Sequence, residues 1–161
     1  MQIFSASYIL PISSPPLAGG AIAVDNGRII DVGTVSDLCR AYSAVVHEFP
    51  GAVILPGMVN AHSHLELTHF PSWKLRKGID YLPRTYVDWV IQIIKIRRAL
   101  TRDELVHSVR EGIRKSLECG TTTVGEILTD HSLAPVYAGA LLSGRLYFEA
   151  IGHASDRCGE L

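Results

Sequence analysis

The segment on which the fold depends is Leu55-Pro56-Gly57-Met58-Val59-Asn60-Ala61-His62-Ser63-His64. An apolar run leads into a Pro-Gly turn, and the segment ends with two histidines one residue apart. Side chains alternate along a strand, so residues i and i+2 share a face. His62 and His64 are therefore predicted to point the same way from the end of a short strand. Two neutral imidazoles that converge make half of a metal site, with a structural role for the pair as the alternative.

The residues before this segment predict a small antiparallel β unit. Asn26-Gly27 separates two β-type runs, which is the strongest short hairpin signal because a type I′ turn needs positive φ at both central residues. Residues 36–43 predict a short helix with Thr34 or Ser36 as N-cap, and residues 45–49 predict a further strand. A unit of this size does not make a stable domain by itself.

The residues after it alternate between strand and helix patterns. Strands are predicted near residues 53–61, 121–127 and 145–151, with a long connection over residues 65–84 and a helix over residues 131–143. This order indicates a parallel α/β sheet with right-handed crossovers.

Two further helices precede the second of these strands. Tyr86 to Leu100 carries one apolar stripe, and Thr101 opens a capping box for a helix over residues 101–119. The basic residues of the first helix are interpreted as a solvated face; they are Lys95, Arg97 and Arg98.

Composition excludes several classes of partner. The net charge is −1, so nothing favours nucleic acid or an anionic membrane. The longest apolar helical stretch, Val87 to Ile96, contains charged residues and is too short to span a bilayer. Three widely spaced cysteines without a CxxC motif favour reduced thiols, and hence a cytoplasmic protein.

Three segments in order resemble the amidohydrolase superfamily, in particular its branch of cytosine-, guanine- and adenosine-type deaminases and chlorohydrolases. Leu55 to Glu66 resembles the first metal-binding motif of that branch. Gly120-Thr121-Thr122-Thr123-Val124 resembles its second barrel strand, and Asp25-Asn26-Gly27-Arg28-Ile29 resembles its N-terminal sandwich segment.

The resemblance implies a (β/α)8 TIM-type barrel with a small β-sandwich built from both chain ends. It also implies a divalent metal, zinc or iron, with His62 and His64 as the first two ligands. The remaining ligands would be a histidine of strand 5 and an aspartate of strand 8. The metal would acidify a water that attacks the carbon carrying an amino or halide group. The implied function is hydrolysis of non-peptide carbon–nitrogen bonds, foremost deamination of an aminated N-heterocycle.

A barrel of this kind needs about 250 residues, whereas this chain has 161. We therefore interpret residues 1–52 as the sandwich segment and residues 53–161 as an incomplete barrel with about three of eight βα units. The metal-binding aspartate and the proton-shuttling glutamate and histidine of the family have no counterpart here. The sequence thus predicts an N-terminal fragment that holds no assigned catalytic acid or base.

Three residues near the barrel mouth are candidates for substrate binding. Glu66 shares a face with His64, His69 follows on the loop, and His153 lies just past the third strand. Glu66 could also orient a ligand histidine. The alternatives are an ordinary loop glutamate for Glu66 and exposed or packing roles for the two histidines. For Glu126, at the end of the second strand, a structural position is favoured over one at the mouth.

Two other functions are consistent with the sequence. One is a two-metal cyclic amide hydrolase related to dihydroorotase or imidazolonepropionase. The other is a non-catalytic remnant, because three strands of an eight-stranded barrel leave unpaired edges that invite association. A homo-oligomer is one expected outcome of such edges.

Overall fold

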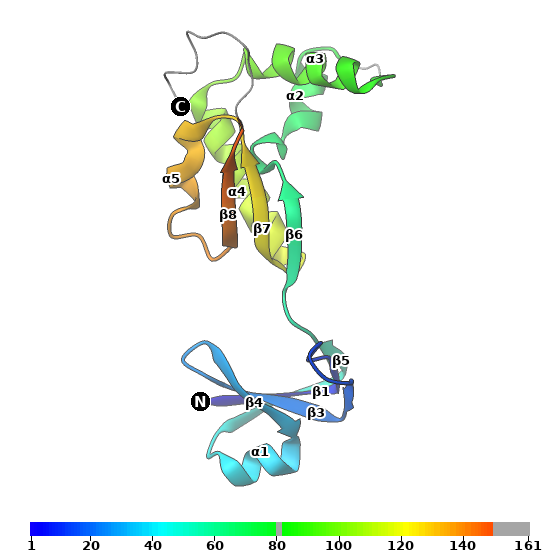
Figure 1. The fold of residues 1–161 in the computed structure, drawn as a ribbon, viewed down its shortest axis with the longest axis vertical. Coiled ribbons are helices and arrows are strands. Elements are labelled where there is room, and N and C mark those ends of the chain that lie inside the picture. Colours follow the sequence, from blue (N-terminus) through cyan, green and yellow to red (C-terminus); the bar gives the residue numbers. More distant parts are fainter. Residues whose placement is uncertain (80–81, 150–161) are drawn as a thin grey trace. The chain divides into compact units, whose positions relative to one another are not determined.

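The computed structural model describes residues 1–79 and 82–149 and divides the chain into two units (Figure 1). The first unit is Met1–Pro56, and the second begins at Gly57. Within the described residues, none of the helices combines the length and the apolar character that crossing a membrane requires.

The first unit is a five-stranded sheet covered by one short helix. Its elements are β1 (Gln2–Ile9), β2 (Leu17–Ala18), β3 (Gly20–Asp25), β4 (Arg28–Thr34), α1 (Val35–Ala41) and β5 (Val45–Ile54). The β3–β4 hairpin is confirmed, with φ of +48° at Asn26 and +74° at Gly27. Thr34 caps α1 by accepting a hydrogen bond from the backbone of Asp37.

One pairing in this sheet differs from the prediction of an antiparallel unit. β1 pairs antiparallel with β2 and β3 but parallel with β5. A parallel pair needs a crossover connection, and α1 lies in that connection. A small core forms between α1 and the sheet from Ile3, Ala21, Ala23 and Leu38.

The second unit is a parallel three-stranded sheet in the order β6-β7-β8. Its strands are β6 (Met58–Ser63), β7 (Thr121–Leu128) and β8 (Ser143–Phe148). Between them lie η1 (Leu65–Leu67), α2 (Phe70–Arg76), α3 (Tyr86–Arg97), α4 (Arg102–Glu118), η2 (His131–Leu133) and α5 (Ala134–Tyr137). The predicted alternation of parallel strands and helices is confirmed.

Several predicted element bounds differ from the structure. The first barrel strand begins at Met58, because Val53 and Ile54 belong to β5 and residues 55–57 belong to neither strand. The connection over residues 65–84 contains η1 and α2. The helix predicted over residues 131–143 is confined to η2 and α5, and Gly139 follows with a φ of +80° that a helix does not accommodate.

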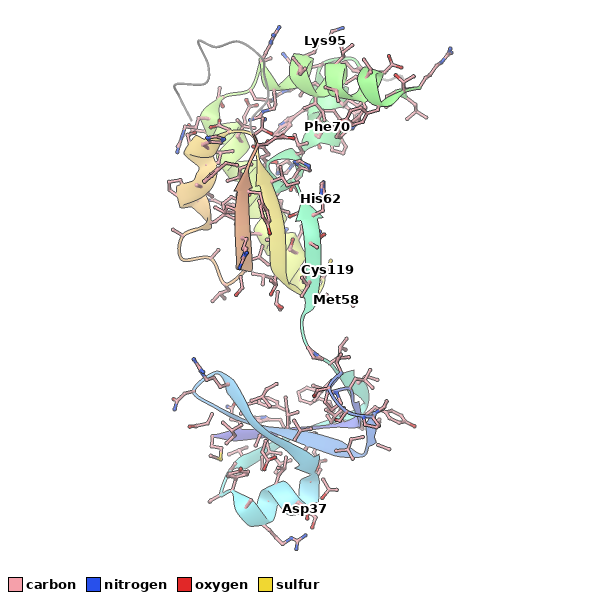
Figure 2. All side chains as sticks on the ribbon, viewed as in Figure 1. Asp37, Met58, His62, Phe70, Lys95 and Cys119 are labelled. Atoms are coloured by element: carbon pink, nitrogen blue, oxygen red, sulfur yellow. The ribbon has the colours of Figure 1, made fainter. Side chains whose placement is uncertain are left out.

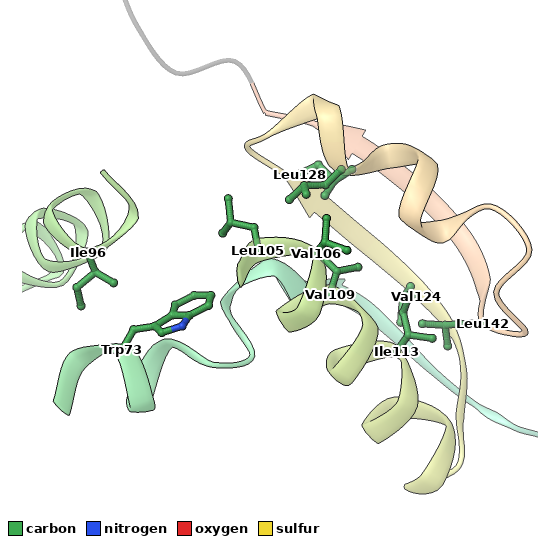
Figure 3. Packing of buried hydrophobic residues seen from close by; sticks show 10 residues of the cluster. Trp73, Ile96, Leu105, Val106, Val109, Ile113, Val124, Leu128 and Leu142 are labelled. Carbon is green, nitrogen blue, oxygen red and sulfur yellow. The ribbon is translucent and has the colours of Figure 1, made fainter. Parts of the chain in front are cut away.

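Among the described residues, α4 supplies more of the buried core of the second unit than any other element does (Figure 3). Both hydrogen bonds of the predicted capping box between Thr101 and Glu104 are present. Residues on one stripe of α4 are buried in this core; they are Leu105, Val109 and Ile113. Figure 3 also shows Trp73 of α2 near Ile96 of α3, and both are buried.

Candidate metal centre

The two predicted ligands lie side by side at the carboxyl end of β6. His62 is an exposed residue of β6 (Figure 2), and the half-buried His64 is the first residue after the end of this strand. Their ring centroids are 5.2 Å apart with an interplanar angle of 69°. The backbone N–H of His62 donates to the side-chain oxygen of Asn60 at 3.2 Å. Neutral imidazoles in this arrangement suit zinc or another borderline metal ion.

Close strand contact supports this end of β6. A Cβ atom built on Gly125 of β7 would lie 2.4 Å from the carbonyl oxygen of Ala61. Only glycine therefore allows β7 to approach β6 this closely, one residue before His62. The position of the first histidine depends on the absence of a side chain on the neighbouring strand.

Glu126 holds the chain on both sides of His64. Its side chain is fully buried. The hydroxyl of Ser63 donates to Oε2 at 2.5 Å, and the backbone N–H of Leu65 donates to Oε1 at 2.7 Å. A third hydrogen bond comes from the hydroxyl of Tyr137, also 2.7 Å from Oε1. Burial, and next the bond to Glu126, raise the pKa of Tyr137, so this hydroxyl stays a donor at neutral pH.

Glu66 is also buried, but its partner is a cation. Only 1% of its side chain is exposed, and Nη1 of Arg97 lies 3.0 Å from Oε1. Nη2 of Arg97 donates to Oε2 at 3.5 Å. The prediction of a solvated face was therefore wrong for Arg97, whose side chain is 18% exposed, and it holds for Lys95 and Arg98. Arg97 lies four residues after Ile93, at the margin of the buried stripe of α3.

His69 lies against α4. Its backbone N–H donates to the hydroxyl of Ser108 at 3.0 Å, and its ring stacks on that of His107 with centroids 5.1 Å apart. Nε2 of His69 is buried and has no hydrogen-bond partner among the described residues. His153 lies outside the described residues. These contacts favour packing roles for Glu66 and His69, and substrate contact by either, or by His153, stays a prediction.

The site therefore gathers two imidazoles and a supporting carboxylate, but not a complete ligand set. Across residues 1–79 and 82–149, no three side chains of the histidine, cysteine, aspartate and glutamate class are grouped to hold a metal ion. The structural position favoured for Glu126 agrees with its burial, but its hydrogen bonds to Ser63 and Leu65 were not predicted. One signal was available, since Glu126 falls between Val124 and Leu128 on the alternating buried face of β7.

Comparison with known proteins agrees with the fold and with the order of its parts. The model of an imidazolonepropionase-like composite domain of bacteria matches residues 20–42. A 5-methylthioadenosine/S-adenosylhomocysteine deaminase of Moorella thermoacetica is 31% identical over 121 residues. That match covers 74% of this chain and 27% of the relative. The chain thus spans about a quarter of the length of this relative.

Two solved structures are similar over most of the chain. Helicobacter pylori aminofutalosine deaminase in complex with methylthio-coformycin superposes with a TM-score of 0.79 at 18% identity, over 99% of this chain and 38% of that one. An adenosine deaminase from Xanthomonas campestris with bound zinc gives a TM-score of 0.66 at 30% identity, over 85% and 31%.

Proposed function

This chain belongs to the amidohydrolase superfamily, and from this premise we propose that it forms part of a metal-dependent deaminase. It folds as the N-terminal part of a TIM-type barrel, preceded by a small β-sheet unit. The reaction is hydrolytic removal of an amino group from a small N-heterocycle, with an adenosine derivative as the first candidate. The observation that carries the proposal is the paired imidazoles of His62 and His64 at the carboxyl end of the first parallel strand. Active sites of such barrels lie at that end of the strands.

We propose zinc as the metal, with iron as the alternative. The zinc-containing adenosine deaminase, 30% identical to this chain, supports zinc. When bound, the metal supplies the acidity that makes water nucleophilic near neutral pH. His62 and His64 would hold it with neutral ring nitrogens, which requires both imidazoles to be deprotonated. A catalytic zinc has three protein ligands as a rule, so at least one further ligand is proposed to lie outside the described residues.

Zinc binding by the full 161-residue chain tests the site. Wild type is expected to bind zinc saturably in competition with a chromophoric chelator. His62→Ala and His64→Ala are each expected to weaken binding at least tenfold. His107→Ala is the matched control, because His107 is exposed on α4 and lies outside the pair. Equal affinity in all four proteins would exclude His62 and His64 as ligands.

Ammonia release then tests the reaction. Zinc-loaded protein is assayed with 5-methylthioadenosine, S-adenosylhomocysteine and free aminopurines. Zinc-dependent release that His62→Ala abolishes supports deamination. Equal release by wild type and His62→Ala refutes it. Zinc binding without any turnover favours the non-catalytic remnant.

One observation favours a second candidate, a cyclic amide hydrolase. The imidazolonepropionase-like domain model matches residues 20–42, which cover β3, β4 and α1. Such an enzyme would open a ring without releasing ammonia. Loss of the ultraviolet absorbance of an imidazolone, with ammonia unchanged, separates the two candidates.

A further inference from the structure

The buried carboxylate of Glu126 contacts the residues immediately before and after His64. Ser63 donates its hydroxyl to one oxygen, and Leu65 donates its backbone N–H to the other. We propose that Glu126 is a positioning residue that sets the direction of the His64 imidazole towards the metal. The proposal rests on the proposed function, in which His64 is a metal ligand.

The geometry restricts the backbone at His64 from both sides. His64 has a φ of −133° and a ψ of +72°, which belongs neither to the strand before it nor to the 3-10 helix after it. The carbonyl oxygen of His64 accepts the backbone N–H of Leu67 at 2.9 Å, and Glu126 adds contacts on either side of it. Glu126 accepts the N–H of the peptide that follows His64, so this peptide plane cannot rotate without breaking that hydrogen bond, and it holds residue 63 through the side-chain hydroxyl.

Glu126 cannot act on substrate directly. It lies on the face of β7 that also carries Val124 and Leu128, both of which belong to the core between strands and helices. Ser63, its partner, is buried, whereas the adjacent His62 is exposed and projects from the opposite face of β6. The effect of Glu126 on the site therefore passes through the backbone of residues 63–65.

Burying a carboxylate is costly, so its retention in an otherwise apolar face needs a reason. If Glu126 only stabilised the fold, the loss of any one of its hydrogen bonds would change zinc affinity to a similar extent. Tyr137 provides the internal comparison, because its hydroxyl donates to the same Oε1 but comes from α5 and not from the segment 63–65. Loss of the Tyr137 bond weakens packing of α5, whereas loss of the carboxylate releases the segment that carries His64.

The test compares three variants of the full 161-residue chain by zinc titration and urea unfolding. Glu126→Met keeps the length of the side chain but removes both acceptors. We expect it to lower zinc affinity about 10- to 100-fold, the usual effect of removing a partner that orients a ligand. Tyr137→Phe is expected to change zinc affinity less than threefold while still lowering the urea midpoint. Glu126→Gln retains one oxygen and is expected to restore affinity in part. Equal zinc affinity in Glu126→Met and Tyr137→Phe would overturn the proposal.

A second measurement needs no metal. In the apo chain, the ¹³Cε1–¹Hε1 signal of His64 reports the order of its ring, and the amide proton of Leu65 reports its hydrogen bond. Glu126→Met is expected to broaden or shift both signals, whereas Tyr137→Phe leaves both within the range of wild type. Unchanged signals in Glu126→Met refute the positioning role, whatever the zinc titration gives. If instead His64→Ala binds zinc as wild type does, the proposed metal site fails, and the apo signals alone decide the role of Glu126.

Discussion

Replacement of Arg97 by methionine is expected to destabilise the second unit by about 3–5 kcal/mol. Arg97 is the ion-pair partner of a carboxylate, Glu66, that is 1% exposed, and the shortest N–O distance between them is 3.0 Å. At an effective dielectric constant of about 20, two unit charges at that distance attract by about 5 kcal/mol. Removing the cation leaves the carboxylate buried without a compensating charge. A typical domain has about 5–15 kcal/mol of stability in all, so the loss is large.

Urea unfolding followed by tryptophan fluorescence measures this loss. Both tryptophans, Trp73 and Trp89, lie in the second unit, so their emission reports that unit alone. The matched control is Arg98→Met, which removes an exposed arginine from the adjacent position and is expected to change stability by less than about 0.5 kcal/mol. In the double variant Glu66→Gln/Arg97→Met no buried charge is left, and much of the stability should return.

Two results would refute this reasoning. Arg97→Met and Arg98→Met could shift the urea midpoint equally, which would mean that the ion pair of Arg97 contributes no more than a solvated side chain. Alternatively, the double variant could be as unstable as Arg97→Met alone, which would attribute the loss to packing and not to the uncompensated charge of Glu66.

Three further predictions follow from individual contacts. Gly125→Ala places a methyl group 2.4 Å from the carbonyl oxygen of Ala61, and it is expected to cost about 1–3 kcal/mol in urea unfolding and to weaken zinc binding; an unchanged midpoint would contradict the close approach of the strands. Hydrogen bonds from Thr101, and next from Arg76, lower the pKa of Glu104 below its ordinary value of 4.5. The stabilisation from Glu104 is therefore complete above pH 4.5 and declines as the pH falls through the lowered value. Glu104→Gln should flatten the acid limb of the stability profile below pH 4.5. Finally, β6 and β8 each lack a strand partner on one edge among the described residues, so light scattering should detect concentration-dependent association; a monomer at all concentrations would count against it.

Local chemistry explains which predictions from the sequence succeeded. The Asn26-Gly27 hairpin and the Thr101 capping box each depend on residues only a few positions apart, and both are present in the structure. The proximity of His62 and His64 likewise follows from the two-residue period of a strand.

Predictions that needed knowledge of distant partners did not succeed. Arg97 was interpreted as solvated because its partner, Glu66, lies 31 positions earlier in the chain. The pairing of β5 with β1 joins residues more than 40 positions apart, and it places Val53 and Ile54 in β5 although they were predicted to belong to the first barrel strand.

The sequence by itself determined the alternation of strands and helices, the turn and cap residues, and the pair of histidines at a strand end, because each is specified by short-range periodicity and backbone conformation. Only the tertiary structure decided which carboxylate supports that pair. Glu66 lies two positions after His64, and Glu126 lies near the end of β7. The fold joins Glu66 to Arg97 and directs both oxygens of Glu126 to the residues flanking His64. A buried carboxylate needs hydrogen-bond donors, and packing determines which donors lie within reach. For Glu126 one of them is Ser63, which lies 63 positions earlier in the chain.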